Sequence, residues 1–165
     1  QNDVDNSPNP IVTPETIRVI IRSRTTRLGH MTTTDDAAVL AANEAFYQAF
    51  EAGDGDAMNA LWSRRATVAC THPGWTAITG RTRVLESWSG ILEGSRGRVA
   101  CLEPVAHVLG DVAFVTCNEA LGNNLLAATN VFVRETDGWH MVHHHASPVA
   151  RAYVKDGPQE GDAVH

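Results

Sequence analysis

The sequence has little charge, no cluster of basic residues and no long apolar run. Charged residues make up 19% of its 165 residues, and the formal net charge is −6. Non-specific binding to nucleic acid needs clustered Lys and Arg side chains that displace phosphate counterions. No stretch reaches the ~20 apolar residues that span a bilayer. We therefore expect neither a nucleic-acid partner nor a membrane segment, and the low charge leaves surface for a partner subunit.

Cysteine is also scarce. Cys70, Cys101 and Cys117 lie far apart, and no CxxC or CxxH pair occurs. An odd and sparse set argues against a disulfide framework and fits a reducing compartment, so we expect a cytoplasmic protein with small, buried thiols. The first residues, QNDVDNSPNP, are polar and lack the apolar core of a signal peptide.

The length predicts one domain with unlike ends. Residues 1–33 combine Asn, Asp and Pro with a short apolar run set among arginines, and a change in composition follows Met31. We interpret residues 1–33 as an N-terminal extension, flexible or in contact with a partner. Residues 34–150 form the predicted domain, and residues 151–165 form a C-terminal tail.

Apolar spacing predicts three helices in the first half of the domain. Thr34, Asp35 and Asp36 are typical of a helix N-terminus. Apolar side chains then recur at three- and four-residue steps, which predicts a helix from Asp35 to Ala52 that ends at Gly53. Further helices are predicted over residues 56–62 and 81–92, separated by a strand in residues 66–73 and a loop in residues 74–80.

The second half of the domain is predicted to be β-sheet. Four alternating or β-branched runs are separated by Gly110-Asp111, Gly122-Asn123 and Asp137-Gly138, which are hairpin signals. The predicted strands cover residues 98–109, 112–121, 125–135 and 139–147. Helices first and consecutive antiparallel strands afterwards indicate the α+β class.

These patterns resemble a known group of proteins. One segment combines an aromatic-rich helix, an A-G-D turn, a short helix and a strand, in the sequence AFYQAFEAGDGDAMNALWSRRATV. This order resembles the NTF2-like superfamily, and within it the SnoaL-like and ketosteroid-isomerase-like proteins. The phrase DGWHMVHHHASP resembles the last strand of the association (hub) domain of calcium/calmodulin-dependent protein kinase II. The resemblance covers about 115 residues and is more specific for fold than for activity, because the fold hosts many functions.

The resemblance implies an NTF2-like cone, in which three N-terminal helices pack on a curved antiparallel sheet. Its concave face would hold a pocket for a small apolar molecule, and its convex face would form a homodimer. It implies either a cofactor-independent isomerase, cyclase or hydratase-like (lyase-like) enzyme, or a non-catalytic ligand-binding or assembly domain.

The run His143, His144 and His145 raises the question of a metal site. Strand alternation places His140, Val142, His144 and Ala146 on one face, and Trp139, Met141, His143 and His145 on the other. The resemblance turns the Val142 set toward the pocket. Three consecutive strand histidines cannot bind one ion together, and zinc requires three or four convergent ligands. Unless His72, His107 or a second subunit contributes, we expect no metal.

His144 is instead a candidate general acid or base. With the same alternation, Glu119 and Asn130 face the pocket from the predicted strands 112–121 and 125–135, and either could lie beside His144. A carboxylate beside the histidine would orient it and raise its pKa. His144 and Glu119 are therefore the candidate catalytic pair, with a hydrogen-bonded core histidine and, if the register slips by one, a solvated Glu119 as the alternatives. Polar groups within aromatic walls are typical of small-molecule sites. The candidate ligand-binding residues are Tyr47, Trp62, Cys70, His72, Trp75, Trp88, Asn130 and Phe132, and for the aromatic residues a purely structural role in the core is the alternative.

Differences from the related proteins reduce the number of activities that the sequence allows. A ketosteroid isomerase needs an oxyanion-hole Tyr and a carboxylate base, and the resemblance places Phe46 and Cys70 at those positions. A typical steroid isomerase is therefore disfavoured unless Tyr47 and Glu119 substitute. The paired pocket arginines of the kinase hub fall on Asn130 and Ala146, which disfavours a dicarboxylate ligand.

Overall fold

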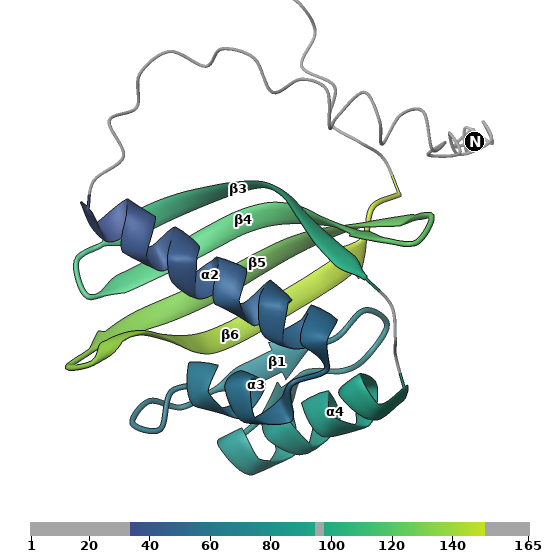
Figure 1. Cartoon of the computed structure of the whole chain (residues 1–165), viewed down its shortest axis with the longest axis horizontal. Helices are drawn as coiled ribbons and strands as arrows, with labels where there is room; N and C mark the ends of the chain where they lie inside the picture. Colours follow the sequence, from purple (N-terminus) through teal and green to yellow (C-terminus); the bar gives the residue numbers. More distant parts are fainter. Residues whose placement is uncertain (1–33, 95–97, 151–165) are drawn as a thin grey trace, which may run out of the picture.

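A computed structural model describes residues 34–94 and 98–150; the interpretations of residues 1–33 and 151–165 lie outside the described residues. The described chain contains three helices and six strands, in the predicted α+β order (Figure 1). The elements are α2 (Thr34–Ala52), α3 (Gly55–Leu61), β1 (Ala69–Thr71), β2 (Ile78–Thr79), α4 (Arg81–Gly94), β3 (Val99–Leu109), β4 (Val112–Leu121), β5 (Asn124–Glu135) and β6 (Gly138–Pro148).

The helices begin and end within two residues of the predicted positions. Asp35 and Asp36 lie in the first turn of α2, near the positive end of the helix dipole. Gly53 follows α2 with φ of 65°, a left-handed conformation that glycine adopts without steric cost. The Asp54 carboxylate then accepts a hydrogen bond of 2.9 Å from the Ala57 amide and caps α3.

The six strands form one sheet in the order β2-β1-β6-β5-β4-β3. The four long strands pair as an antiparallel meander, as predicted, whereas β1 runs parallel to β6. The strand predicted over residues 66–73 is shorter, covering Ala69–Thr71. The predicted loop before α4 contains β2, which pairs with β1.

A bulge in β6 corrects one detail of the predicted alternation. Val131 pairs with His143 but Phe132 pairs with Met141, so Val142 is an extra residue in β6. The side chains change faces there: Met141 is buried on the inner side, whereas Val142 is only half-buried. Trp139 is also buried, so the prediction that Trp139 and Met141 lie on the outer face was wrong. The prediction that His140 and Val142 face the pocket was wrong for the same reason. After the bulge, His144 and Ala146 point inward, as predicted.

Helix α2 lies across the concave face of the sheet, and α3 and α4 lie beyond its β6–β1 side (Figure 1). The helices and the sheet enclose one apolar core, whose largest fully buried side chains include Trp62, Phe46, Phe132, Met58 and Met141. No helix in the described ranges is long and apolar enough to cross a membrane.

Candidate functional site

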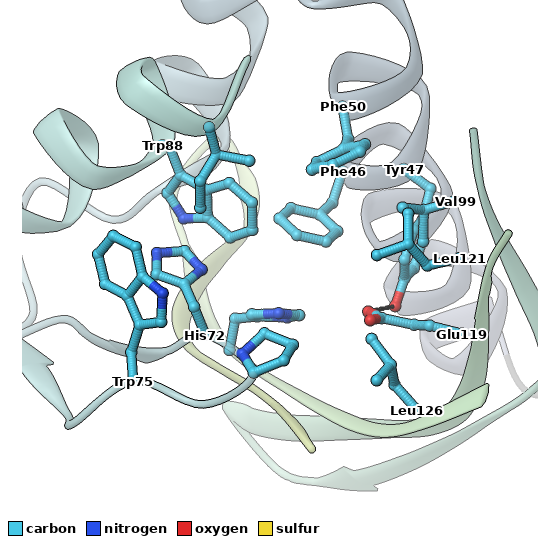
Figure 2. Close-up of a pocket in the computed structure, with 13 residues that line it drawn as sticks. Phe46, Tyr47, Phe50, His72, Trp75, Trp88, Val99, Glu119, Leu121 and Leu126 are labelled. Carbon is cyan, nitrogen blue, oxygen red and sulfur yellow. Dashed lines mark hydrogen bonds between the residues drawn. The ribbon is translucent and has the colours of Figure 1, made fainter. Parts of the chain in front are cut away.

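A cavity of about 240 Å³ lies between α2, α4 and the concave face of the sheet (Figure 2). Its walls are mainly aromatic and aliphatic, and none of the described residues that line it is Lys or Arg. Its lining consists of Phe46, Tyr47, Phe50, His72, Pro73, Trp75, Trp88, Ile91, Val99, Glu119, Leu121, Leu126 and His144. The cavity thus combines apolar walls with a few polar groups.

His144 projects into this cavity from β6 and is 2% exposed. Its ring lies against Phe46 and Trp88, at centroid distances of 5.1 and 5.4 Å. Burial among these rings disfavours the charged imidazolium, and neighbouring histidines add to the effect. The pKa of His144 is therefore lowered to about 3, and the imidazole is neutral near pH 7.

Two asparagines connect His144 to helix α2. The Asn130 Oδ1 atom lies 2.6 Å from His144 Nδ1, and Asn130 Nδ2 donates to Asn43 Oδ1 over 2.7 Å. Asn130 Nδ2 also lies 3.3 Å from the Tyr47 hydroxyl. Both amides are almost fully buried, so protein groups rather than bulk water satisfy them.

Glu119 faces the cavity from β4 and is 5% exposed. The Tyr47 hydroxyl donates a 2.8 Å hydrogen bond to Glu119 Oε1 (Figure 2) and lies 3.2 Å from the Cys117 sulfur. Burial raises the pKa of Glu119, and the hydrogen bond from Tyr47 offsets part of that rise. Burial, with Glu119 as a secondary cause, also raises the pKa of Tyr47, so its hydroxyl stays a donor.

Of the two neighbours that the sequence left open for His144, Glu119 and Asn130, the structure shows Asn130 beside the ring. An amide, Asn130, and not the carboxylate of Glu119, bonds the ring, and the pKa of His144 is lowered instead of raised. The register of β4 and β5 is as predicted, since Glu119, Asn130 and Phe132 are all buried on the inner face. Glu119 is linked to His144 through Tyr47 and Asn130.

A second neutral imidazole, that of His72, lies on the side of the cavity opposite Glu119 (Figure 2). His72 follows β1, and its Nε2 atom lies 2.9 Å from the Ser87 hydroxyl of α4. Burial lowers the pKa of His72 to about 4. Its ring contacts Trp88 and Trp75, and the Trp75 side chain is 54% exposed (Figure 2). The cavity lining therefore reaches solvent at Trp75, whereas His72, 3% exposed, is buried beside it.

The structure divides the predicted ligand-binding residues into two groups. Tyr47, His72, Trp75 and Trp88 line the cavity together with His144 and Glu119. The remaining candidates, Trp62, Cys70, Asn130 and Phe132, are buried behind the cavity and do not line it. Burial raises the pKa of Cys70 to about 12, so this thiol behaves as an apolar core group.

Sequence reasoning did not assign Asn43 to the site. It lies on the buried face of α2, one turn before Phe46, and is 1% exposed. A polar side chain within an apolar helical stripe signals a buried hydrogen-bonding partner, and that signal could have identified it. The aliphatic cavity residues carried no such signal, because they have the same chemistry as the core.

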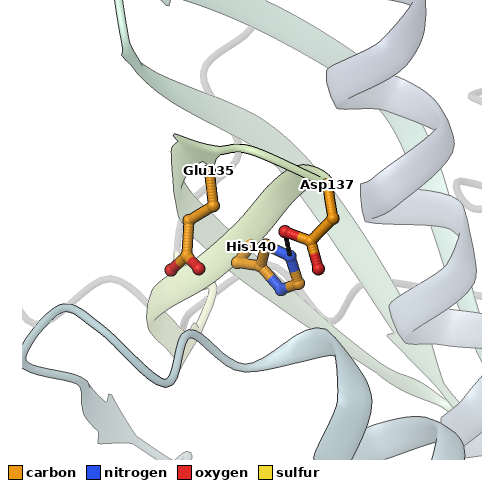
Figure 3. A group of neighbouring side chains, drawn as sticks. All are labelled: Glu135, Asp137 and His140. Carbon is orange, nitrogen blue, oxygen red and sulfur yellow. Dashed lines mark hydrogen bonds and ion pairs between the residues drawn. The ribbon is translucent and has the colours of Figure 1, made fainter.

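One group of described side chains could bring three metal-ligating atoms together. Atoms of Glu135, Asp137 and His140, at the turn between β5 and β6, lie within 4.8 Å of one another (Figure 3). Other partners already hold these groups: Ser63 donates to Glu135 over 2.6 Å, and Asp137 lies 3.0 Å from His140. The nearby Arg65 guanidinium, 3.6 Å from Glu135, also disfavours a cation there. His143 and His145 do not belong to this group.

Comparison with known proteins agrees with the fold and leaves the activity open. A candidate dehydratase of the NTF2-like family from Streptomyces avermitilis is 38% identical, with a TM-score of 0.66 over 70% of this chain and 96% of that one. A candidate calcium/calmodulin-dependent protein kinase type II association domain from Thiobacillus denitrificans is also 38% identical, with a TM-score of 0.61 over 67% and 94% of the two chains.

The F-box protein SKIP8 of Arabidopsis thaliana is 30% identical over 113 residues, which are 67% of this chain and 49% of that protein. The chain thus spans about half the length of this curated relative. The family model for the SnoaL-like domain matches residues 39–151, which include every described helix and strand except the first turns of α2. The chain therefore belongs to the SnoaL-like domain family, within the NTF2-like superfamily.

Proposed function

We propose that this protein is a cofactor-independent lyase or isomerase that acts on a small apolar molecule, with His144 as general base and Glu119 as general acid. One observation carries the proposal: a neutral imidazole and a carboxyl group of raised pKa face the same apolar cavity. Pairs of titratable groups whose surroundings drive their pKa values apart are typical of acid–base sites.

The protonation states near neutral pH suit proton transfer through the ligand. His144 is unprotonated and can accept a proton, while the raised pKa of Glu119 favours the form that donates one. The lowered pKa makes His144 a weak base, which by itself disfavours proton abstraction from the ligand. When Glu119 releases its proton in the same step, the carboxylate and the imidazolium form together, and their attraction in a medium of low polarity offsets this cost.

Elimination of water from a β-hydroxyketone fits this arrangement. His144 would remove the proton next to the carbonyl, the carbon–carbon double bond would form, and the carbon–oxygen bond of the hydroxyl would break. Glu119 would donate its proton to the leaving hydroxyl, which departs as water. Proton exchange with solvent would then restore both groups. The similarity to a candidate dehydratase supports this class of reaction.

The absence of cationic groups from the described lining favours a neutral ligand. An anionic ligand would lack the guanidinium forks that recognise carboxylates. Aromatic rings from α2, α4 and the loop before β2 instead offer flat apolar walls. A cavity of about 240 Å³ fits a molecule with one ring or two fused rings better than a steroid.

The test uses a panel of one- and two-ring β-hydroxyketones. We expect at least one of them to raise the melting temperature and to lose 18 mass units in the presence of the protein, through elimination of water. The Glu119→Gln variant, which keeps the acceptor for Tyr47, should retain binding and lose turnover by about 10²-fold or more. A panel without stabilisation or water loss, or an equally active Glu119→Gln variant, would overturn the proposal.

A second candidate function is assembly through the outer face of the sheet. Val105, Leu109 and Val112 expose large apolar side chains there, and His107 stacks on Phe114 at a centroid distance of 4.5 Å. The similarity to an association domain supports a homo-oligomer. We propose a homodimer through this face, which is compatible with an active pocket on the inner face.

Light scattering coupled to size-exclusion chromatography tests this assembly. We expect the mass of two chains, and we expect Leu109→Asp to shift it toward one chain, because a charge would enter an apolar interface. Asp111→Asn, at an exposed position in the adjacent turn, is the matched control and should leave the mass unchanged. A wild-type mass of one chain would exclude the dimer.

A further inference from the structure

We infer that Asn130 and Asn43 are positioning residues that fix the His144 imidazole with its proton on Nδ1. The Nε2 lone pair is then the atom available to a ligand in the cavity. The use of this lone pair in catalysis rests on the proposed function, whereas the position of the proton does not. In water the neutral histidine side chain favours the proton on Nε2, so the protein must impose this tautomer.

The polarity of the hydrogen bonds determines where the proton lies. An amide oxygen only accepts and an amide nitrogen only donates. Asn130 Nδ2 has an acceptor on its own side, Asn43 Oδ1 at 2.7 Å. Its Oδ1 atom, 2.6 Å from His144 Nδ1, must therefore accept a hydrogen bond from a protonated Nδ1. Rotating the Asn130 amide by half a turn would set two oxygens against each other at Asn43.

Asn43 is oriented in turn by Cys101, the last group in this series of hydrogen bonds. Its Nδ2 atom donates to the Cys101 sulfur over 3.6 Å, which turns its Oδ1 atom toward Asn130. Every bond in the series therefore runs in one direction, from His144 through Asn130 and Asn43 to Cys101. Asn43 and Asn130 are 1% and 0% exposed, so bulk water cannot supply alternative partners.

His72 has the opposite tautomer and provides an internal control. The Ser87 hydroxyl has one hydrogen, and it donates that hydrogen to the Val84 carbonyl over 2.7 Å. His72 Nε2, 2.9 Å from the same oxygen, must then donate its own proton. The two histidines of the cavity thus carry their protons on different ring atoms, each fixed by a separate neighbour.

The choice of an amide over a carboxylate also has a consequence. An aspartate at position 130 would still accept the Nδ1 proton, but its charge would favour the imidazolium. Asn130 orients the ring without adding a negative charge, so burial can keep the imidazole neutral, as an acceptor for a ligand hydroxyl or an acidic C–H group requires. Asn130 therefore determines which ring atom accepts the proton.

Nitrogen NMR of the ¹⁵N-histidine-labelled full chain, without ligand, tests the inference. In the wild type we expect protonated Nδ1 in His144 and protonated Nε2 in His72. Asn130→Asp should keep the His144 tautomer and raise its pKa. Asn130→Leu should shift His144 toward Nε2–H and leave His72 unchanged, whereas Ser87→Ala should affect His72 alone.

The inference is overturned if wild-type His144 carries its proton on Nε2, or if Asn130→Leu leaves the tautomer unchanged. Should Asn130→Leu fail to fold, the wild type and the isosteric Asn130→Asp variant still decide the question. Because the tautomer is read without ligand, inactivity toward every substrate would reject the proposed function and leave this inference standing. Where turnover is found, Asn130→Asp should move the acidic limb of the pH–rate profile to higher pH.

Discussion

The two faces of strand β6 place the same amino acid in different chemical surroundings. His144 points inward, is 2% exposed and bonds Asn130 over 2.6 Å. His145, the next residue, is exposed on the outer face, and His143 is half-buried there. The rings of His143 and His145 lie 6.3 Å apart and belong to no metal-ligating group among the described residues. For these three histidines, the face of β6 on which each lies decides whether it can reach a ligand in the cavity.

The largest expected difference between the faces is in packing. Phe132 of β5 is 1% exposed on the inner face, whereas Phe114 of β4 stacks on His107 at the half-buried outer face. Phe132→Ala should lower the free energy of unfolding by about 3–5 kcal/mol, because it leaves a cavity. Phe114→Ala should lower it by about 1 kcal/mol, as expected for an aromatic pair near the surface. Urea unfolding of both variants measures the contrast, and equal losses would contradict it.

The second-largest expected difference between the two faces is in how stability depends on acidic pH. The pKa of His144 is lowered to about 3 in the folded protein, against an ordinary value of 6.5 when the chain unfolds. The unfolded state therefore binds more protons between these values, and stability falls as the pH decreases through this window. Between pH 6.5 and 4 the contribution of His144 is about 3 kcal/mol, at ~1.4 kcal/mol for each pH unit.

Chemical denaturation at several pH values measures this dependence. His144→Gln should reduce the acid-induced loss of stability without abolishing it, because burial also lowers the pKa of His72 to about 4. His145→Gln is the matched control on the outer face and should follow the wild-type curve. An identical pH dependence in the wild type and in His144→Gln would show that His144 is not a neutral buried group.

A smaller effect is expected at the other end of the polar network. Tyr47→Phe removes the 2.8 Å hydrogen bond to Glu119 and should lower the free energy of unfolding by about 1 kcal/mol. Because that bond favours the carboxylate, its loss should raise the pKa of Glu119 further. Carbon NMR of the labelled Glu119 carboxyl group follows the titration. A lower pKa in the variant would be the contradictory result.

The smallest effect is expected on the outer face itself. His145 is exposed, and His145→Ala should change the free energy of unfolding by no more than about 0.5 kcal/mol. Urea unfolding at pH 7, where subunit dissociation is followed separately by light scattering, measures it. A loss above about 1 kcal/mol would mean that the outer histidines take part in a structure that the single chain does not contain.

The sequence predicted the fold well because its signals are local. Apolar spacing located α2 and α4 to within two residues, and turn dipeptides located all four long strands. Alternation brought His144 and Glu119 to the inner face because the register of β4 and β5 is regular. The same rule was wrong for Trp139 and Met141, since the bulge at Val142 reverses the alternation and leaves no recognisable signal in the sequence.

The partner of His144 could not be predicted in the same way. Asn130 and Glu119 both face inward, but distances across a cavity depend on the curvature of the sheet and on how α2 crosses it. Asn43 looked like one polar residue in an apolar helix until the packing of α2 placed it 2.7 Å from Asn130. Trp62 and Phe132 share the chemistry of cavity walls, yet they are buried behind the cavity.

The most direct test of a catalytic inner face compares the turnover of two neighbouring variants. His144→Gln and His145→Gln make the same change on opposite faces of β6, and both are assayed with the β-hydroxyketone that the wild-type protein dehydrates. We predict that His144→Gln loses about 10²-fold or more of the wild-type kcat, as expected for a general base. His145→Gln should stay within about twofold. Equal rates for the two variants would contradict a catalytic role for the inner face.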